Sequence, residues 1–344
     1  MDRLSLREEA ILNTLIRTYV KTGEPVGSRT ISKLGLGLSA ATVRNSMADL
    51  EEKGYLSHPH TSAGRVPTDK GYRYYVDKLM DEEALVEKDR QRIRDNMVVR
   101  FWEGNIEGVL EQVSRAVADV SHNLGVALAP RFERGIFQRL EMVHLSKSRL
   151  LLVLTIRSGL VRTMVMEVDS NISASELEET KRVINERLFG LTVGEIRESV
   201  GERLRSVSRG SPRLLRLVSD SVDTLFKFNS GEDLHFGGAG NFFLQPEFSS
   251  DQKGLAALLG LLEERELMVT ILDERMDLEG IAITIGNEHR SPALRNCSLL
   301  TSRYWVGNVS GIIGMIGPTR IPYARMVPML QYMTDLTEEI LEQQ

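Results

Sequence analysis

The chain has 344 residues, of which 42% are hydrophobic and 26% are charged, and its formal net charge at pH 7 is −5. That length and apolar content suffice for two or three domains with buried cores, and they exclude a disordered chain. A single cysteine, Cys297, excludes an internal disulfide and a multi-cysteine metal site, and it favours a reducing compartment such as the cytoplasm.

The N-terminus, MDRLSLREEAILNTLI, is charged and amphipathic. It lacks the continuous apolar core of a signal peptide, so we expect none. No stretch of the sequence approaches the roughly 18 uncharged apolar residues that a membrane-spanning helix requires. We therefore expect a cytoplasmic protein without a membrane partner.

The negative net charge is unevenly distributed. Residues 1–79 carry 12 Lys and Arg against 9 Asp and Glu, whereas the remaining residues carry 31 against 39. A mild positive excess suits a protein that reads nucleic acid through a few phosphate contacts, and not one that coats it by bulk charge. Nucleic acid is therefore a candidate partner of the N-terminal region alone.

The N-terminal region predicts a helix-turn-helix. A first helix is expected over residues 5–22, where apolar residues recur at helical spacing. A short helix capped by Ser28 follows, and then a Gly35-Leu36-Gly37 turn. Ser39 is expected to cap the next helix. Two helices joined by a tight glycine turn are the frame of a helix-turn-helix motif.

The helix after Ser39 has two distinct faces. Val43, Met47 and Leu50 recur at i, i+4 and i+7, and they form the stripe that we expect to be buried. The side chains left facing outward are small or form hydrogen bonds: Ala41, Thr42, Arg44 and Asn45. A helix with such an outer face, on a fixed partner helix, is typical of one that enters a DNA major groove.

Two short strands around a glycine-containing turn are predicted next, at residues 55–57 and 66–67. This hairpin is typical of a wing. The side chains at its turn are short or cationic, which suits close approach to a DNA backbone or minor groove: Thr61, Ser62, Gly64 and Arg65. A plain solvent-exposed hairpin is the alternative. A further helix opens at Pro67-Thr68-Asp69, and its cations Lys70 and Arg73 are also predicted to contact DNA.

Arg44 and Asn45 are the main candidates for DNA contact. Arginine pairs with a guanine edge or a phosphate, and asparagine with an adenine edge or a phosphate. The alternative is a solvated or intradomain role. Ser28, Arg29 and Ser39 are candidates for phosphate contacts, with simple helix capping as the alternative for the serines. In the wing, Arg65 is the strongest candidate because it carries charge.

The remaining chain alternates between helical and strand patterns. Residues 81–104 are charge-dense and predict a solvated connecting helix. Further helices are expected at 105–124, 173–188, 192–206, 213–227, 251–265 and 323–342. Strand-favouring runs lie at 126–128, 140–145, 149–156, 161–168, 267–272, 280–285, 297–304 and 307–316. The runs joined by the Ser158-Gly159 turn predict an antiparallel meander. Strands, then helices, then strands again predict one sheet domain with an insertion.

No catalytic, metal or cofactor site is predicted. His58 and His60 lie two residues apart, but no further ligands accompany them. The run Gly237-Gly238-Ala239-Gly240 lacks the Lys-Ser/Thr pair of a phosphate loop, so it is interpreted as a backbone turn in the inserted domain. Cys297 has no neighbouring histidine and is interpreted as a buried small side chain. Without an acid-base or nucleophile constellation, the sequence does not predict an enzyme.

The run SAATVRNSMADLEEKGYLSHPHTSAGRVPTDKGYRYYVD resembles the N-terminal signature of the HrcA family, the bacterial heat-inducible transcription repressors. The C-terminal run GMIGPTRIPYARMVPMLQYM and residues 241–248 are similar to further segments of that family, so the resemblance covers essentially the whole chain. It implies an α+β multidomain protein of four parts. These are a winged helix-turn-helix domain (1–80), a connecting helix (81–104), a GAF-like antiparallel sheet domain with helices (105–206 and 266–344) and an inserted α+β dimerising domain (207–265).

The resemblance also implies a function. It implies a negative regulator of heat-shock (chaperone) operons that binds an inverted-repeat operator in double-stranded DNA as a homodimer. Its activity would be supported by the GroE chaperonin and lost on heat stress. Two recognition helices then require half-sites separated by about a whole number of duplex turns. The alternative is a ligand-sensing winged-helix regulator whose GAF-like domain binds a metabolite, because fold by itself does not establish function.

Overall fold

The computed structural model describes residues 4–59, 64–98, 106–157, 161–168, 172–205, 207–222 and 233–342. It is a mixed α/β structure whose sheets are antiparallel, as predicted, and it forms two compact units. Unit 1 comprises Met1–Leu128, Leu234–Arg303 and Ile312–Thr337, and unit 2 comprises Ala129–Asp233, Tyr304–Gly311 and Glu338–Gln344. Within the described ranges, no helix is long and apolar enough to cross a membrane.

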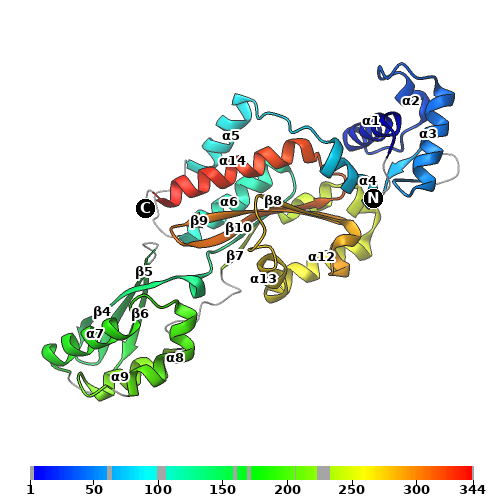
Figure 1. The fold of residues 1–344 in the computed structure, drawn as a ribbon. Helices are drawn as coiled ribbons and strands as arrows, with labels where there is room; N and C mark the ends of the chain where they lie inside the picture. Colours follow the sequence, from blue (N-terminus) through cyan, green and yellow to red (C-terminus); the bar gives the residue numbers. More distant parts are fainter. Residues whose placement is uncertain are drawn as a thin grey trace. The chain divides into compact units, whose positions relative to one another are not determined.

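Unit 1 begins with the predicted helix-turn-helix and hairpin (Figure 1). Its elements are α1 (Leu6–Thr22), α2 (Ser28–Ser32), α3 (Ala40–Glu52), β1 (Leu56–Ser57), β2 (Val66–Pro67), α4 (Asp69–Tyr74) and the π-helical turn η1 (Tyr75–Leu79). A capping box between Ser5 and Glu8 starts α1, and Gly23, at φ 70°, ends it. One detail was wrong: Ser28 is the first residue of α2 and not its cap, since Gly27 occupies that position.

The predicted solvated connecting helix is shorter and less solvated than expected. The helix α5 covers Glu87–Val98, and residues 80–86 before it are not helical. Ile93 and Met97 of α5 are completely buried, and α5 packs against α6 (Ile106–Ser121). Two apolar side chains four residues apart thus give this charge-rich helix a buried face.

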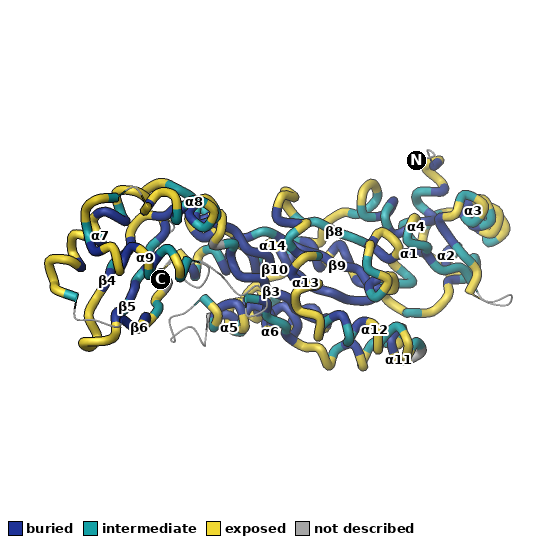
Figure 2. Tube along the Cα trace, turned by 90° about the horizontal axis from the view of Figure 1, so that it is seen from below, coloured by how far each residue is buried: buried dark blue, intermediate teal, exposed yellow. Residues whose placement is uncertain are grey.

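The main body of unit 1 is a five-stranded sheet with helices on both faces. The strand order is β7 (Leu234–Gly237), β3 (Leu124–Leu128), β10 (Val309–Pro318), β9 (Cys297–Val306) and β8 (Ile281–Ile285). In Figure 1, α6 and α14 (Tyr323–Glu342) lie on one face, and α12 (Gln252–Glu263) and α13 (Arg265–Asp273) lie on the other. Every residue of β3 and β10 is buried, and these strands are dark throughout in Figure 2.

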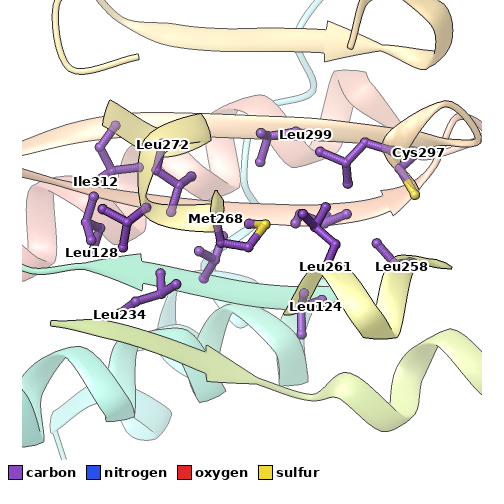
Figure 3. Packing of buried hydrophobic residues seen from close by; sticks show 14 of the residues in the cluster. Leu124, Leu128, Leu234, Leu258, Leu261, Met268, Leu272, Cys297, Leu299 and Ile312 are labelled. Carbon is purple, nitrogen blue, oxygen red and sulfur yellow. The ribbon is translucent and has the colours of Figure 1, made fainter. Parts of the chain in front are cut away.

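The core between the sheet and α12 and α13 is mainly aliphatic, and it includes Phe242 and Phe248, whose rings are in contact. Figure 3 shows side chains of β3, β9 and β10 directed at those of the two helices, and Cys297 lies among them as predicted. The labelled members are Leu124, Leu128, Leu234, Leu258, Leu261, Met268, Leu272, Cys297, Leu299 and Ile312. Burial raises the pKa of the Cys297 thiol to about 12, so this sulfur is an unreactive packing group.

Unit 2 contains the predicted antiparallel meander. Its strands are β4 (Phe137–Ser146), β5 (Arg149–Ile156) and β6 (Val161–Glu167), in that order. Its helices are α7 (Ala174–Leu188), α8 (Val193–Arg205) and α9 (Pro212–Asp220). The Asn185 amide of α7 bonds both the amide and the carbonyl of Leu140 in β4. The Ser158-Gly159 turn and residues 223–227 of the predicted helix lie outside the described residues.

The chain divides at different places from those expected. The strands between 137 and 167 pair only with one another within the described ranges, so they form the sheet of unit 2 and not part of the five-stranded sheet. Conversely, much of 207–265 belongs to unit 1, because β7 and α12 contribute to its sheet and core. The Gly237-Gly238-Ala239-Gly240 turn accordingly follows β7 in unit 1 and does not lie in an insertion.

The strand predicted at 267–272 is wrong. This segment is helical and forms most of α13. Met268, Val269 and Leu272 are spaced to face one side of a helix, and all three are buried in the core. Packing against the sheet therefore outweighs the strand preference of its β-branched residues.

Candidate nucleic-acid interface

The recognition helix α3 is held by a local cap and a buried stripe. The Ser39 Oγ accepts a hydrogen bond from the Thr42 amide at 3.1 Å, and it lies 2.9 Å from the Thr42 hydroxyl. Val43, Met47 and Leu50 are buried, as predicted. Helical geometry then directs the opposite face of α3 away from the domain core.

The outer face of α3 presents uncommitted polar side chains. Arg44 and Asn45 are exposed, Ala41 is exposed, and Thr42 is half-buried with its hydroxyl against Ser39. Over the described residues, neither Arg44 nor Asn45 has a side-chain hydrogen bond or ion pair. A guanidinium and an amide that remain free in the folded chain are available to pair with base edges or phosphates.

The helix α2, which packs against α3, presents a second cation. Arg29 is exposed and Ser28 is half-buried at the start of this five-residue helix. Because Ser28 makes no side-chain cap, the alternative of simple capping does not apply to it. Both residues remain candidates for phosphate contact.

The wing is anchored to the segment that precedes α2. Val26 and Arg65 exchange backbone hydrogen bonds of 2.9 Å, and β1 pairs with β2 beside them. A Cβ on Gly64 would lie 2.3 Å from the carbonyl carbon and oxygen of Val26, so only glycine permits this approach. Close packing against Val26 therefore explains why position 64 is a glycine. Thr61, Ser62 and His60 lie outside the described residues.

Arg65, the strongest candidate in the wing on charge alone, has partners inside its own domain. Its guanidinium forms an ion pair of 2.7 Å with Glu51 of α3 and donates to His58 Nδ1 at 2.8 Å. Its side chain is 19% exposed. Arg65 therefore ties the wing to the recognition helix. The hydrogen bond from Arg65 gives the His58 ring a partner within the same domain. Within the described part of the chain, no three His, Cys, Asp or Glu side chains are grouped to hold a metal ion.

Lys70 and Arg73, the two cations predicted on the helix after the wing, behave differently. Lys70 remains exposed, although its Nζ donates to the Lys53 carbonyl at 2.7 Å and lies 4.4 Å from the centre of the Tyr55 ring. Arg73 forms four hydrogen bonds within unit 1. It donates to both oxygens of Glu288, to the Ile283 carbonyl and to Asp77. Arg73 therefore attaches α4 within unit 1, and its contact with DNA stays a prediction.

Sequence reasoning missed the residues that attach α4 to the sheet. The Asp69 carboxylate accepts hydrogen bonds of 2.8 Å from both the amide and the side chain of Asn287, next to Glu288. A second attachment lies at α1, where Arg320 donates to the Val20 carbonyl at 2.9 Å and to Glu247. These residues have no local pattern that distinguishes them from other surface charges.

A helix-turn-helix with a free outer face, beside a hairpin tied to it, defines the winged-helix class of DNA-binding proteins. Residues 107–327 match the family model described as "HrcA protein C terminal domain". The chain is 38% identical over 342 residues to the heat-inducible transcription repressor HrcA of Chlorobium phaeobacteroides (strain BS1), covering 96% of this chain and 97% of that one. It is 39% identical over 350 residues to the HrcA of Geobacter sulfurreducens (strain ATCC 51573 / DSM 12127 / PCA), covering 99% of both.

The chain therefore belongs to the HrcA family of heat-inducible transcription repressors. A solved structure shares its fold. This is a crystal structure of a hypothetical protein at 2.2 Å resolution, with a TM-score of 0.63 and 23% identity over 99% of both chains. The family is one of transcription repressors and not of enzymes.

Proposed function

We propose that this repressor binds, as a homodimer, an inverted-repeat operator in double-stranded DNA upstream of chaperone operons. The observation that carries the proposal is the outer face of α3, where Arg44 and Asn45 are exposed and without partners over the described residues. Two such helices related by a two-fold axis match an operator with the same symmetry.

The contacts divide into those that position the domain and those that read sequence. Arg44 and Asn45, with Ala41 and Thr42 beside them, are proposed for the major groove. Ser28, Arg29, Ser39 and Lys70 are proposed for phosphates, together with Thr61 and Ser62 in the wing turn. Gly64 and Arg65 act indirectly, because they hold the wing against Val26 and Glu51.

We further propose that unit 2 forms the dimer contact through the open face of its sheet. Val143, Leu151 and Val165 lie opposite one another across β4, β5 and β6. Val143 and Val165 are each 49% exposed, Leu145 is 53% exposed and Val161 is 55% exposed. Apolar side chains grouped in this way mark an interaction surface. This proposal moves the dimerising part from 207–265 to Ala129–Asp233.

The remaining expectations from the family resemblance are also proposals. The five-stranded sheet with its helices is proposed to be GAF-like, and the protein is proposed to act in the cytoplasm, where bacterial DNA lies. The GroE chaperonin is proposed to support the DNA-binding state, and heat stress to abolish it. Heating reduces the folded fraction of a marginally stable protein, and this is a sufficient physical cause for the loss of DNA binding.

Footprinting on chaperone-operon promoters of the source organism tests the proposal. We expect protection of an inverted repeat at nanomolar to micromolar protein, and stronger protection when chaperonin is present. Protection confined to a single half-site would contradict the dimer. Protection that is identical with and without chaperonin would contradict the proposed role of GroE while leaving operator recognition intact.

A further inference from the structure

A cavity of about 240 Å³ lies at the edge of the five-stranded sheet in unit 1. The end of α13, the edge strand β8 and the turns η4 (Gly286–Glu288) and η5 (Pro292–Leu294) line it. Its volume is somewhat below the roughly 300–1,000 Å³ of typical ligand sites. A cavity of this size accommodates a small metabolite and not a nucleotide.

The cavity contains a buried cation that forms no direct ion pair with a carboxylate over the described residues, although Glu274 and Glu288 lie near enough to stabilise its charge. Arg275 is only 8% exposed, and its guanidinium donates to the hydroxyls of Thr284 and Thr301. The two nearby carboxylates have other partners: Glu274 pairs with Arg290 at 2.9 Å, and Glu288 pairs with Arg73 at 2.6 Å. Over the described residues Arg275 has no ion pair.

The charge of Arg275 affects the groups around it. Burial lowers the pKa of Arg275 to about 10, so it remains charged at neutral pH. Burial and the charge of Arg275 together lower the pKa of His289 to about 4, which keeps that imidazole neutral. A buried guanidinium without an anion is costly, and an anionic ligand would relieve that cost.

His289 provides a second polar group with unused hydrogen-bonding capacity. The residue is 7% exposed and lines the cavity, and its Nε2 is buried without a well-formed hydrogen bond over the described residues. Backbone groups of Cys297 and Thr284 and the charge of Glu288 act to raise its pKa, against the larger effects of burial and of Arg275. Buried polar atoms normally have partners, so an unsatisfied one in a cavity indicates a ligand or water.

Aliphatic side chains also line the cavity: Ile271, Leu278, Ile283 and Leu294. The carboxylates of Glu274 and Glu288 line it too. A suitable ligand therefore has one anionic end and a short hydrocarbon part. The planar guanidinium matches a carboxylate through two parallel hydrogen bonds. Because Glu274 and Glu288 also line the cavity, a monoanion is less strongly repelled there than a phosphate dianion.

We propose that this cavity binds a small organic monocarboxylate, with Arg275 as its ion-pair partner, His289 as a neutral hydrogen-bonding group and the aliphatic residues around its hydrocarbon part. Glu288 lines the same cavity and holds Arg73 of α4, and the Ile283 carbonyl accepts from Arg73. A bound carboxylate would thus lie against the residues that attach the helix after the wing. The effect on operator affinity rests on the proposed function, but binding itself does not.

Isothermal titration calorimetry on the full chain without DNA tests the binding. The probes are butyrate, isovalerate and benzoate, their uncharged amides butyramide and benzamide, and inorganic phosphate. We expect at least one carboxylate to bind, and its amide to bind at least about tenfold more weakly because the charge-assisted hydrogen bonds are lost. Absence of binding by all three carboxylates would overturn the proposal. Phosphate binding as tight as the best carboxylate would overturn the ligand class.

Two variants separate loss of the site from loss of the fold. Arg275→Met removes the charge at similar volume, and Leu278→Trp fills the cavity from a side chain that is 47% exposed and so tolerates enlargement. We expect both to weaken carboxylate binding at least tenfold, with circular dichroism unchanged for Leu278→Trp. The control is Arg295→Ala, since Arg295 is an exposed arginine of the same unit that does not line the cavity. Unchanged binding in a folded Leu278→Trp variant would place the carboxylate elsewhere and overturn the assignment.

Operator affinity provides the last readout. Saturating carboxylate is expected to change the dissociation constant for operator DNA in the native chain and to leave it unchanged in Leu278→Trp. An affinity that is the same with and without bound carboxylate would show that Glu288 does not couple the cavity to the winged helix. Calorimetric binding with no operator binding at all would instead count against the proposed function and not against the cavity.

Discussion

Arg73 of α4 donates hydrogen bonds to both carboxylate oxygens of Glu288, at 2.7 and 2.6 Å, across 215 positions of sequence. The pair is partly buried, with side chains 21% and 34% exposed. Burial is the largest single effect and opposes ionisation of Glu288. The hydrogen bonds from Arg73 and the Ile285 amide and the charge of Arg73 together outweigh it, so the pKa of Glu288 lies below its usual value. The residue pair therefore fastens the helix behind the wing to the sheet of the same unit.

The first prediction concerns this attachment. Arg73→Ala leaves Glu288 without its main partner, and we expect the free energy of unfolding of unit 1 to fall by about 1–2 kcal/mol, discounted for partial exposure. A double-mutant cycle with Glu288→Gln measures the interaction by urea denaturation. If the two substitutions change the free energy of unfolding by strictly additive amounts, the interaction between Arg73 and Glu288 does not stabilise the protein.

The second prediction concerns the recognition helix. Arg44→Ala should weaken operator binding by about 1–3 kcal/mol, because a free guanidinium on the outer face of α3 loses a base or phosphate contact. Fluorescence anisotropy with operator DNA measures it, and light scattering should show unchanged dimerisation. Arg216→Ala is the matched control, since Arg216 is an exposed arginine in unit 2. Equal affinity for Arg44→Ala and the control would remove α3 from the interface.

The salt dependence of the same titration separates base contact from phosphate contact. Loss of a phosphate contact should reduce the slope of log K against log salt by about one and act equally on all sequences. Loss of a base contact should leave the slope nearly unchanged and relax specificity at one operator position. Either result supports DNA contact by Arg44 and assigns its role.

The third prediction concerns acid stability. A hydrogen bond from Lys53, with further bonds from Ser5, lowers the pKa of Glu8 from 4.5 to about 2. Because the folded-state pKa is the lower one, this stabilisation is present above about pH 4.5 and is lost as pH falls to about 2. Glu8→Gln should therefore lower the free energy of unfolding by about 1–3 kcal/mol at pH 7.

The difference between native protein and Glu8→Gln should shrink between pH 4.5 and 2. Thermal unfolding at a series of pH values measures it, with Glu24→Gln as the control because Glu24 is exposed. A difference that stays constant over this range would show that the charge of Glu8 is not what stabilises α1.

The fourth prediction concerns the dimer. Val143→Glu and Val165→Glu each place a charge on the open face of the unit 2 sheet, and burying that charge in an interface is unfavourable. We expect monomers by light scattering at micromolar concentration, with circular dichroism unchanged and operator affinity reduced at least tenfold. Phe189→Glu serves as control, since Phe189 is 64% exposed in the same unit. Dimers that persist in both valine variants would place the contact on another surface.

The sequence by itself determined the features that depend on neighbours within a few residues. The Ser39 cap, the buried stripe of Val43, Met47 and Leu50 and the exposure of Arg44 and Asn45 follow from helical periodicity and local hydrogen bonds. The β4–β5–β6 meander was predictable for the same reason, because short connections join strands that pair with their sequence neighbours.

Only the tertiary structure decided which distant residues meet. Arg65 and Arg73 look alike in the sequence, but Glu51 and Glu288 hold them inside the protein while Arg44 stays free over the described residues. The segment at 267–272 is helical because the sheet accepts its apolar face, and β3 pairs with β10 although the paired residues are 184 to 192 positions apart in the sequence. Local preferences amount to fractions of a kcal/mol per residue, so burial and pairing between remote segments outweigh them wherever the two disagree.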